Sequence, residues 1–163
     1  MISPNRGIFV REFSAKYILD VLDLRIILEK RGIEHSVEML TPEIRQSLQS
    51  MRGEMSYVIS HGRYNLEKHD ALDTAFHGLI MDFNDNEFIS EVAEKISALN
   101  SMFRNVSLQS PERAYESQVE HIQLIDCLLE GDIEQAVRIN DGHIGRTKRR
   151  VIGEFQKRKH QGA

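Results

Sequence analysis

The sequence has no tryptophan, only three prolines and a single cysteine in 163 residues, and aromatic residues make up 7% of it. With Cys127 alone, the chain cannot form an internal disulfide, and the apolar neighbours of this residue predict a small core side chain. Because proline interrupts helices, its scarcity beside long periodic segments favours an all-helical protein. The sequence has no signal-peptide pattern and no apolar run long enough to span a bilayer, so we expect a cytoplasmic protein that does not contact membranes.

The overall charge argues against a chain that binds nucleic acid over its surface. The formal net charge is −4, whereas nucleic-acid-binding domains are usually strongly basic. Lys and Arg nevertheless gather at residues 148–150 and 157–159, with Glu154 between them. We interpret these cations as the solvated end of a last helix, where the helix dipole favours positive charge.

Hydrophobic periodicity predicts six helices joined by short connections. Start signals are expected at Ser14, at Thr41 with Pro42, and at Asp132, whereas Gly32 is expected to end the first helix. Six helices with short connections in one domain predict an all-α antiparallel bundle. The expected segments are residues 14–30, 41–60, 65–81, 87–104, 110–130, and a last one that begins at 132.

The first expected helix has a polar residue at a position that the pattern reserves for an apolar one. One row along this helix is apolar, and the adjacent row, which also begins with apolar residues, continues with Arg25 and Glu29. An arginine on an inward face needs an anionic partner. Two partners remain open, a local carboxylate or an acidic ligand. The two rows are Tyr17, Val21, Leu24 and Leu28, and Ile18, Leu22, Arg25 and Glu29.

The segment 72–77, Leu-Asp-Thr-Ala-Phe-His, is the most informative stretch for function. A spacing of four residues places the Asp73 carboxylate and the His77 imidazole on one helix face, one turn apart. His121 and His143 lie in later helical segments, and we predict that three helices bring these four residues around one divalent metal. A solvated, hydrogen-bonded pair is the alternative for Asp73 and His77, because such pairs often occur by chance.

Taken in order, these features resemble the FCD domain, the C-terminal effector-binding domain of FadR-type GntR transcription regulators. The resemblance extends from residue 13 to about residue 151 and depends on short motifs at family-like separations. They are residues 22–29 (Leu-Asp-Leu-Arg-Ile-Ile-Leu-Glu), 73–77 (Asp-Thr-Ala-Phe-His), 120–122 (Glu-His-Ile), 130–132 (Glu-Gly-Asp) with Ala136, and 143–144 (His-Ile).

The resemblance also implies how the chain is divided. Residues 5–10, Asn-Arg-Gly-Ile-Phe-Val, look like the last wing strand of the winged helix-turn-helix domain that precedes the FCD domain in this family. We therefore expect residues 1–12 to be the remnant of a wing strand and linker. Residues 13–155 would form the all-helical effector-binding and dimerisation domain, and residues 156–163 a basic tail.

The resemblance implies a metal site beside a cavity for an effector. Asp73, His77, His121 and His143 match the metal ligands of the family, and three imidazoles with one carboxylate suit zinc first, then nickel, iron or manganese. Arg25 matches an arginine that faces the effector cavity in the family. Arg104 is a second candidate for binding the effector. The remaining histidines match no ligand and are expected at the surface: His35, His61, His69 and His160.

Three functions are compatible with the sequence. The first is a sensor in which a small organic acid bound at the metal alters a homodimer, with DNA contacted only through a winged-helix domain outside this chain. The second is a metal-dependent hydrolase, because three histidines with an open coordination position also describe catalytic zinc. We expect no enzyme, since the chain has no glutamate placed as in His-Glu-x-x-His. The third is a purely structural dimerisation module.

Overall fold

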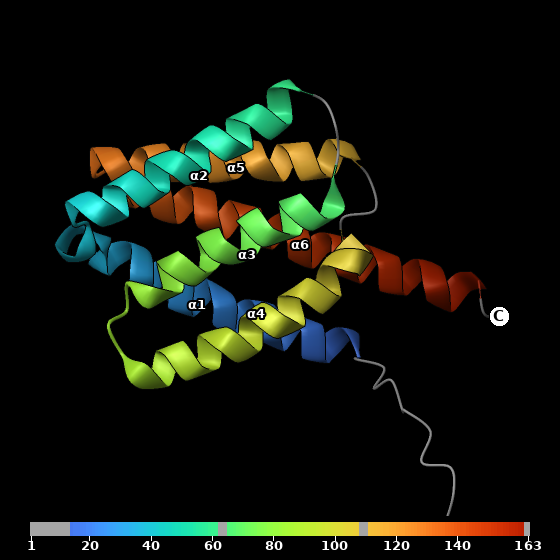
Figure 1. Ribbon diagram of the computed structural model, residues 1–163. Coiled ribbons are helices and arrows are strands. Elements are labelled where there is room, and N and C mark those ends of the chain that lie inside the picture. The colour runs from blue at the N-terminus through green and yellow to red at the C-terminus, as the bar shows by residue number, and fades with distance from the viewer. Residues whose placement is uncertain (1–13, 62–64, 108–110, 162–163) are drawn as a thin grey trace, which may run out of the picture.

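The computed structural model describes residues 14–61, 65–107 and 111–161, with the backbone but not the side chains of residues 66, 101–107 and 158–161. Within these ranges the chain forms helices and no strand. Each helix runs in the direction opposite to the preceding one (Figure 1), which confirms the predicted all-α antiparallel bundle of six helices. The helices are α1 (Ala15–Met39), α2 (Pro42–Ser60), α3 (Leu66–Asp82), α4 (Glu87–Ser107), α5 (Pro111–Glu130) and α6 (Ile133–Gln161).

Polar side chains cap the helices at the predicted start signals. The hydroxyls of Ser14 and Thr41 each accept a hydrogen bond from the backbone N–H three residues later, at 3.1 and 3.3 Å. The Asp132 carboxylate caps α6 in the same way at 3.1 Å, and Gly131 before it has a φ of 80° that suits glycine. The predicted wing strand at residues 1–12 lies outside the described residues. None of the described helices is both long and apolar enough to cross a membrane.

The prediction that Gly32 ends the first helix is wrong, because α1 continues to Met39. Gly32 is buried where α1 meets α3, and a Cβ at this position would lie 2.0 Å from the backbone oxygen of Ile80. The absence of a side chain therefore lets two helix backbones approach closely. Asn84, just beyond α3, strengthens this contact by donating a hydrogen bond to the Leu28 carbonyl at 3.0 Å. Close packing thus outweighs the low helix propensity of glycine.

The hydrophobic core has one large cluster and two smaller ones. Figure 1 shows α2 and α5 along one edge of the bundle and α1 and α4 along the other, with α3 and α6 between them. The large cluster includes Leu48 and Met55 of α2, Phe76 of α3 and Leu128 of α5. Smaller clusters join α1 to α6 and α1 to α3 and α4. Every helix therefore has apolar side chains in the core, and this packing also fixes which helix faces place polar groups inside the bundle.

The buried row of α1 is the one that contains Arg25. Ile18, Leu22, Arg25 and Glu29 are all buried, whereas Leu24 in the adjacent row is 40% exposed. The arginine and the glutamate therefore lie inside the bundle, where each charge needs a partner.

Replacing Gly32 with alanine is expected to destabilise the protein by on the order of 1–3 kcal/mol, the usual cost of overpacking. The reason is the 2.0 Å approach of a Cβ to the Ile80 carbonyl oxygen. Urea unfolding measures the change. Gly53→Ala is the matched control, because Gly53 lies on the exposed side of α2 and a Cβ there meets nothing within 4 Å. The control is expected to stabilise the helix by roughly 0.5–1 kcal/mol. Equal effects at both positions would show that close approach does not explain Gly32.

Candidate metal centre

The four predicted ligands converge inside the bundle. Asp73 and His77 come from α3, His121 from α5 and His143 from α6, and all four side chains are buried. Each offers one donor atom, and these atoms lie within 4.8 Å of one another. The alternative of a solvated Asp73–His77 pair is therefore excluded by the burial of both residues. Three helices that are distant in sequence together build one polar cluster.

The three imidazoles direct their Nε2 atoms toward one another. Nε2 of His121 lies 3.1 Å from Nε2 of His77 and 3.4 Å from Nε2 of His143. Asp73 Oδ1 completes the group at 3.8 Å from His77 Nε2 and 3.6 Å from His121 Nε2. Phe76 of the apolar core contacts the rings of His77 and His121, with centroid distances of 5.3 and 5.0 Å, and so forms one wall of the site.

The outer nitrogens of two of these imidazoles face carboxylates. His77 Nδ1 lies 3.0 Å from Glu29 Oε2, and His143 Nδ1 lies 2.6 Å from Glu120 Oε2. An ionised carboxylate only accepts hydrogen bonds, so each Nδ1 carries the proton and donates it. Nε2 of His77 and Nε2 of His143 then keep their lone pairs, which point into the cluster. This tautomer is the one in which a histidine binds a metal through Nε2.

Arg25 keeps the Glu29 carboxylate ionised. Its Nε donates to Glu29 Oε1 at 2.5 Å, and the side chain of Glu29 is completely buried. Burial alone would raise the pKa of Glu29, but the charge of Arg25 and the hydrogen bond with His77 hold this pKa at about 2. A continuous chain of polar contacts therefore runs from Arg25 through Glu29 to His77.

Glu120 is held by arginines in a similar way. Arg113 donates from both terminal nitrogens to the two oxygens of Glu120, at 3.1 and 3.2 Å, and Arg146 Nε lies 2.8 Å from Oε1. Burial would raise the pKa of Glu120, yet the hydrogen bonds from His143 and the arginines hold it well below its ordinary value. Glu120 can therefore orient His143 as an ionised hydrogen-bond acceptor.

Burial favours the neutral imidazoles that a metal requires. It lowers the pKa of His143 to about 4, although the hydrogen bond with Glu120 opposes this change. Burial and the neighbouring histidines lower the pKa of His121 well below its usual value. At neutral pH His121 and His143 are uncharged, so no positive charge on these two imidazoles repels a cation that enters the cluster. The donor set and the tautomers of His77 and His143 fit a divalent transition metal.

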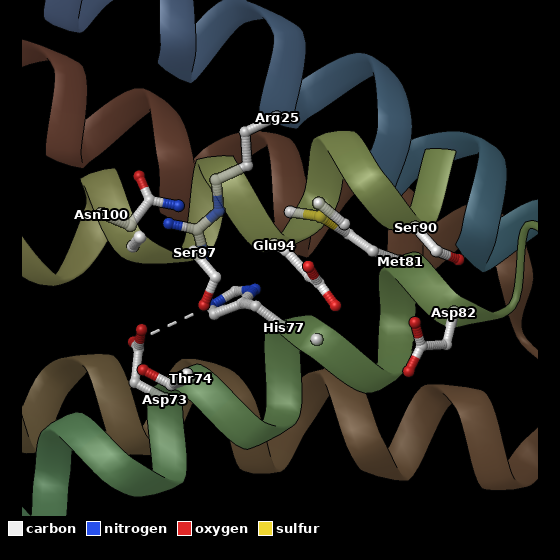
Figure 2. Close-up of a pocket in the computed structure, with 13 residues that line it drawn as sticks. Arg25, Asp73, Thr74, His77, Met81, Asp82, Ser90, Glu94, Ser97 and Asn100 are labelled. Atoms are coloured by element: carbon white, nitrogen blue, oxygen red, sulfur yellow. Dashed lines mark ion pairs between the residues drawn. The ribbon is translucent and has the colours of Figure 1, made fainter. Parts of the chain in front are cut away.

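A cavity of about 390 Å³ opens beside the cluster, between α1, α3 and α4. Figure 2 shows Arg25, Asp73 and His77 on its wall, together with polar side chains of α4 such as Ser97 and Asn100. The volume is enough for a small organic molecule. A ligand in this cavity would reach two of the candidate metal ligands and Arg25 at the same time.

Of the two partners that the sequence left open for Arg25, the structure shows the local carboxylate. Glu29 is its local carboxylate partner, and Arg25 also lines the cavity. One of its terminal nitrogens, Nη2, is buried and has no hydrogen-bond partner among the described residues. A buried donor without an acceptor is costly, so this nitrogen is suited to an acid group of a ligand.

The predictions for Arg104 and His69 have different outcomes. Arg104 belongs to α4, but its side chain lies outside the part that the structure describes, so its role stays a prediction. The prediction that His69 is a surface residue is wrong, because it is 1% exposed and its Nδ1 lies 2.6 Å from Gln118 Nε2. His69 faces a polar residue of α5, one turn before His121, rather than solvent.

Glu29 and Glu120 were not singled out as site residues from the sequence. A local signal existed for each of them. Glu29 follows Arg25 by one helical turn, and Glu120 follows Arg113 by two turns and precedes a predicted ligand. Their distance from the histidines that they orient, 48 residues for His77 and 23 for His143, could not be inferred from spacing.

The fold of this chain is also found in proteins of known structure. None of the curated proteins matches the chain. Among solved structures, the metal-free FCD domain of TM0439, assigned as a transcriptional regulator, superposes with a TM-score of 0.73 at 22% identity, over 90% of this chain and 99% of that one. The Zn²⁺-bound FCD domain of TM0439 gives a TM-score of 0.74 at 23% identity, over 89% of this chain and 98% of that one. At such identities these likenesses concern the fold.

The family itself is identified by sequence. The FCD domain family matches residues 20–146, a range that runs from α1 into α6 and contains all four residues of the polar cluster. This match covers most of the 163 residues. The chain therefore belongs to the FCD domain family.

Proposed function

We propose that this chain is the ligand-sensing and dimerisation domain of a bacterial GntR/FadR-type transcription regulator. In this proposal Asp73, His77, His121 and His143 hold one divalent metal, zinc in the first place. A small organic acid binds in the adjacent cavity, with its acid group at Arg25 and beside the metal. The regulator would act as a homodimer and contact DNA through winged-helix domains.

The observation that carries the proposal is the convergence of four donor atoms beside a cavity that is lined by two of these ligands, Asp73 and His77, and by Arg25. A purely structural cluster would have no reason to leave a buried guanidinium nitrogen without a partner beside an open space. The Zn²⁺-bound structure of a protein with the same fold supports zinc as the first metal to test.

The arrangement suggests how binding could alter the domain. The candidate ligands tie α3, α5 and α6 together, while the cavity is lined by α1, α3 and α4. An acid in the cavity would add contacts from α1 and α4 to the metal-bearing helices. A ligand shifts a conformational equilibrium only if it binds the two states differently, and contacts that span separate helices provide such a difference.

The hydrolase alternative has less support. The two carboxylates that contact the imidazoles, Glu29 and Glu120, are ionised hydrogen-bond acceptors that also pair with arginines. A general base has to receive a proton, and the low pKa of both groups opposes this. The glutamates therefore suit the orientation of ligands better than proton transfer.

The protein purified without chelator or nickel resin is expected to contain about one transition metal per chain. His77→Ala combined with His143→Ala should abolish this content, since two of the four donors are removed. Elemental analysis measures the metal, and circular dichroism verifies the helical fold. His35→Ala combined with His61→Ala is the control, because these histidines lie outside the cluster. A parent protein without metal, even after incubation with zinc, nickel and manganese, would contradict the proposal.

Glu29→Gln and Glu120→Gln are each expected to weaken metal affinity by about 10–100-fold, the usual effect of losing a group that orients a ligand. The amide preserves size but no longer holds the imidazole as a charged acceptor. Competition with a chromophoric chelator measures the affinity. Glu116→Gln is the control, since Glu116 contacts Arg113 at 3.1 Å but is not hydrogen-bonded to a candidate ligand. Unchanged affinity in the first two variants would mean that the carboxylates do not orient the histidines.

Arg25→Lys is expected to weaken the binding of small acids by about tenfold or more, because an ammonium cannot reproduce the fork of a guanidinium. Titration calorimetry of the metal-loaded protein against hydroxy, keto, sugar and amino acids would identify a ligand and measure this loss. Arg31→Lys, at an exposed position of the same helix, controls for the substitution itself. If no acid binds the metal-loaded parent protein, the sensing proposal fails.

A further inference from the structure

The cavity beside the metal cluster has two ends that differ in charge. In Figure 2, Arg25, Asn100 and Asp73 are drawn toward one end, and Asp82 and Ser90 toward the other, with Glu94 between them. We call the first the arginine end, and the second, together with Glu94, the acidic end. The acidic end is not used by the candidate metal centre, so its charges require a separate explanation.

The arginine end has two buried polar atoms without a protein partner. Arg25 is 5% exposed and Asn100 is 6% exposed. Arg25 Nη2 and Asn100 Oδ1 have no hydrogen-bond partner among the residues that the structure describes. One is a donor and the other an acceptor, and both residues line the cavity. A ligand with an acid group next to a hydrogen-bond donor would satisfy both atoms.

The acidic end has two carboxylates and no cation. Asp82 at the end of α3 and Glu94 of α4 both line the cavity and are exposed at its rim. Neither forms an ion pair with another described residue. Partial burial and the negative charge of Glu94 raise the pKa of Asp82, as expected for two carboxylates that face each other without a counter-ion. A positive charge between them would relieve this repulsion.

The surface next to the acidic end has the same sign of charge. Asp82 and Glu94 also line a neighbouring hollow, which further contains Asp85, Glu87 and Glu91. Among the described residues that line the two hollows, Arg25 is the only lysine or arginine. A ligand thus approaches through a negatively charged mouth and meets positive charge only at the inner end. Such a field opposes the entry of a molecule with two negative charges.

We propose that the effector is a zwitterionic amino acid, with its carboxylate at the arginine end and a protonated amine between Asp82 and Glu94. This inference rests on the proposed function and specifies its ligand class. Asp82 and Glu94 are then the residues that select the amine and reject dicarboxylates. Like charges at the acidic end discriminate against the wrong ligand, while opposite charges attract the right one.

The two carboxylates lead us to expect an order of ligand affinities that a rim without charge would not produce. For acids of equal length, an ammonium group at the far end should bind better than a methyl or hydroxyl group, and a second carboxylate should bind worst. For partly exposed charges at contact distance, we expect each step of this series to change affinity by about tenfold.

The test uses the metal-loaded protein and straight-chain acids that differ only at the far end. The probes are δ-aminovalerate, δ-hydroxyvalerate, valerate and glutarate, with γ-aminobutyrate, butyrate and succinate as a shorter set. Titration calorimetry at low ionic strength gives the affinities. The expected result is tightest binding of the amino acid in at least one of the two sets, and weakest binding of the dicarboxylate in both.

Asp82→Asn and Glu94→Gln are expected to remove this preference and leave the affinity for valerate nearly unchanged. Both positions are exposed, so the fold should persist, and circular dichroism verifies it. Glu54→Gln is the matched control, because it removes one negative charge from an exposed position of α2 that lines neither hollow. The control should preserve the preference for the amino acid.

The outcomes separate this inference from the function on which it rests. If the amino acid is the tightest ligand of the parent in neither set, or if a dicarboxylate binds as tightly as the amino acid of its set, the domain senses acids but the inference about the amine is overturned. If the preference persists in the double variant Asp82→Asn with Glu94→Gln, these carboxylates do not select the ligand, and the inference is likewise overturned. If none of the probes and no acid of the broader panel binds, the sensing function itself fails.

Discussion

The structure of the site depends on how two carboxylates inside the bundle are neutralised. Glu29 is completely buried and Glu120 is partly buried, and an unpaired charge at such a position would be unfavourable. Arg25 pairs with the first and Arg113 with the second, and the remaining capacity of each carboxylate is used by an imidazole. Each glutamate therefore stays ionised and fixes the tautomer of a histidine. Without these pairs, no other hydrogen bond among the described residues would direct the Nε2 lone pairs of His77 and His143 toward a common point.

The packing of the bundle explains why these partners meet. Arg25 and Glu29 lie on α1, whereas the histidine that Glu29 orients lies on α3. The close contact at Gly32 brings the backbones of α1 and α3 together within one turn of Glu29. On the opposite side, Glu120 of α5 reaches His143 of α6 across a pair of helices joined by the tight turn at Gly131. The close contact at Gly32 and the tight turn at Gly131 thus position the helices that carry the polar cluster.

Much of the fold followed from local rules, and the exceptions have physical causes. Helix starts at Ser14, Thr41 and Asp132 were predictable because each cap depends only on the next three residues. The end of α1 was not, because the reason for Gly32 lies on another helix. The i, i+4 spacing of Asp73 and His77 was visible locally, His121 and His143 were predicted from their place in later helical segments, and the family resemblance matched all four.

The contacts that orient the histidines could not be predicted from the sequence, for the same reason as the role of Gly32. Sequence spacing describes neighbours along one helix, while the bond from Glu29 to His77 spans 48 residues. His69 shows the converse error, since a histidine without a role in the family pattern was assigned to the surface but is buried against Gln118. Local rules therefore locate side chains on a helix face, and only packing determines what that face meets.

Arg25 connects the metal cluster to the cavity. Its Nε holds Glu29, which orients His77, while its Nη2 has no hydrogen-bond partner among the described residues and the side chain lines the cavity. A ligand that draws the guanidinium toward itself would change the hydrogen bond to Glu29 and thereby the contact that orients His77. Any such effect of a ligand on metal affinity must be matched by an equal effect of the metal on ligand affinity, since binding free energies are reciprocal. The metal would then be more than an anchor for the ligand, because its occupancy would set the concentration at which the domain responds.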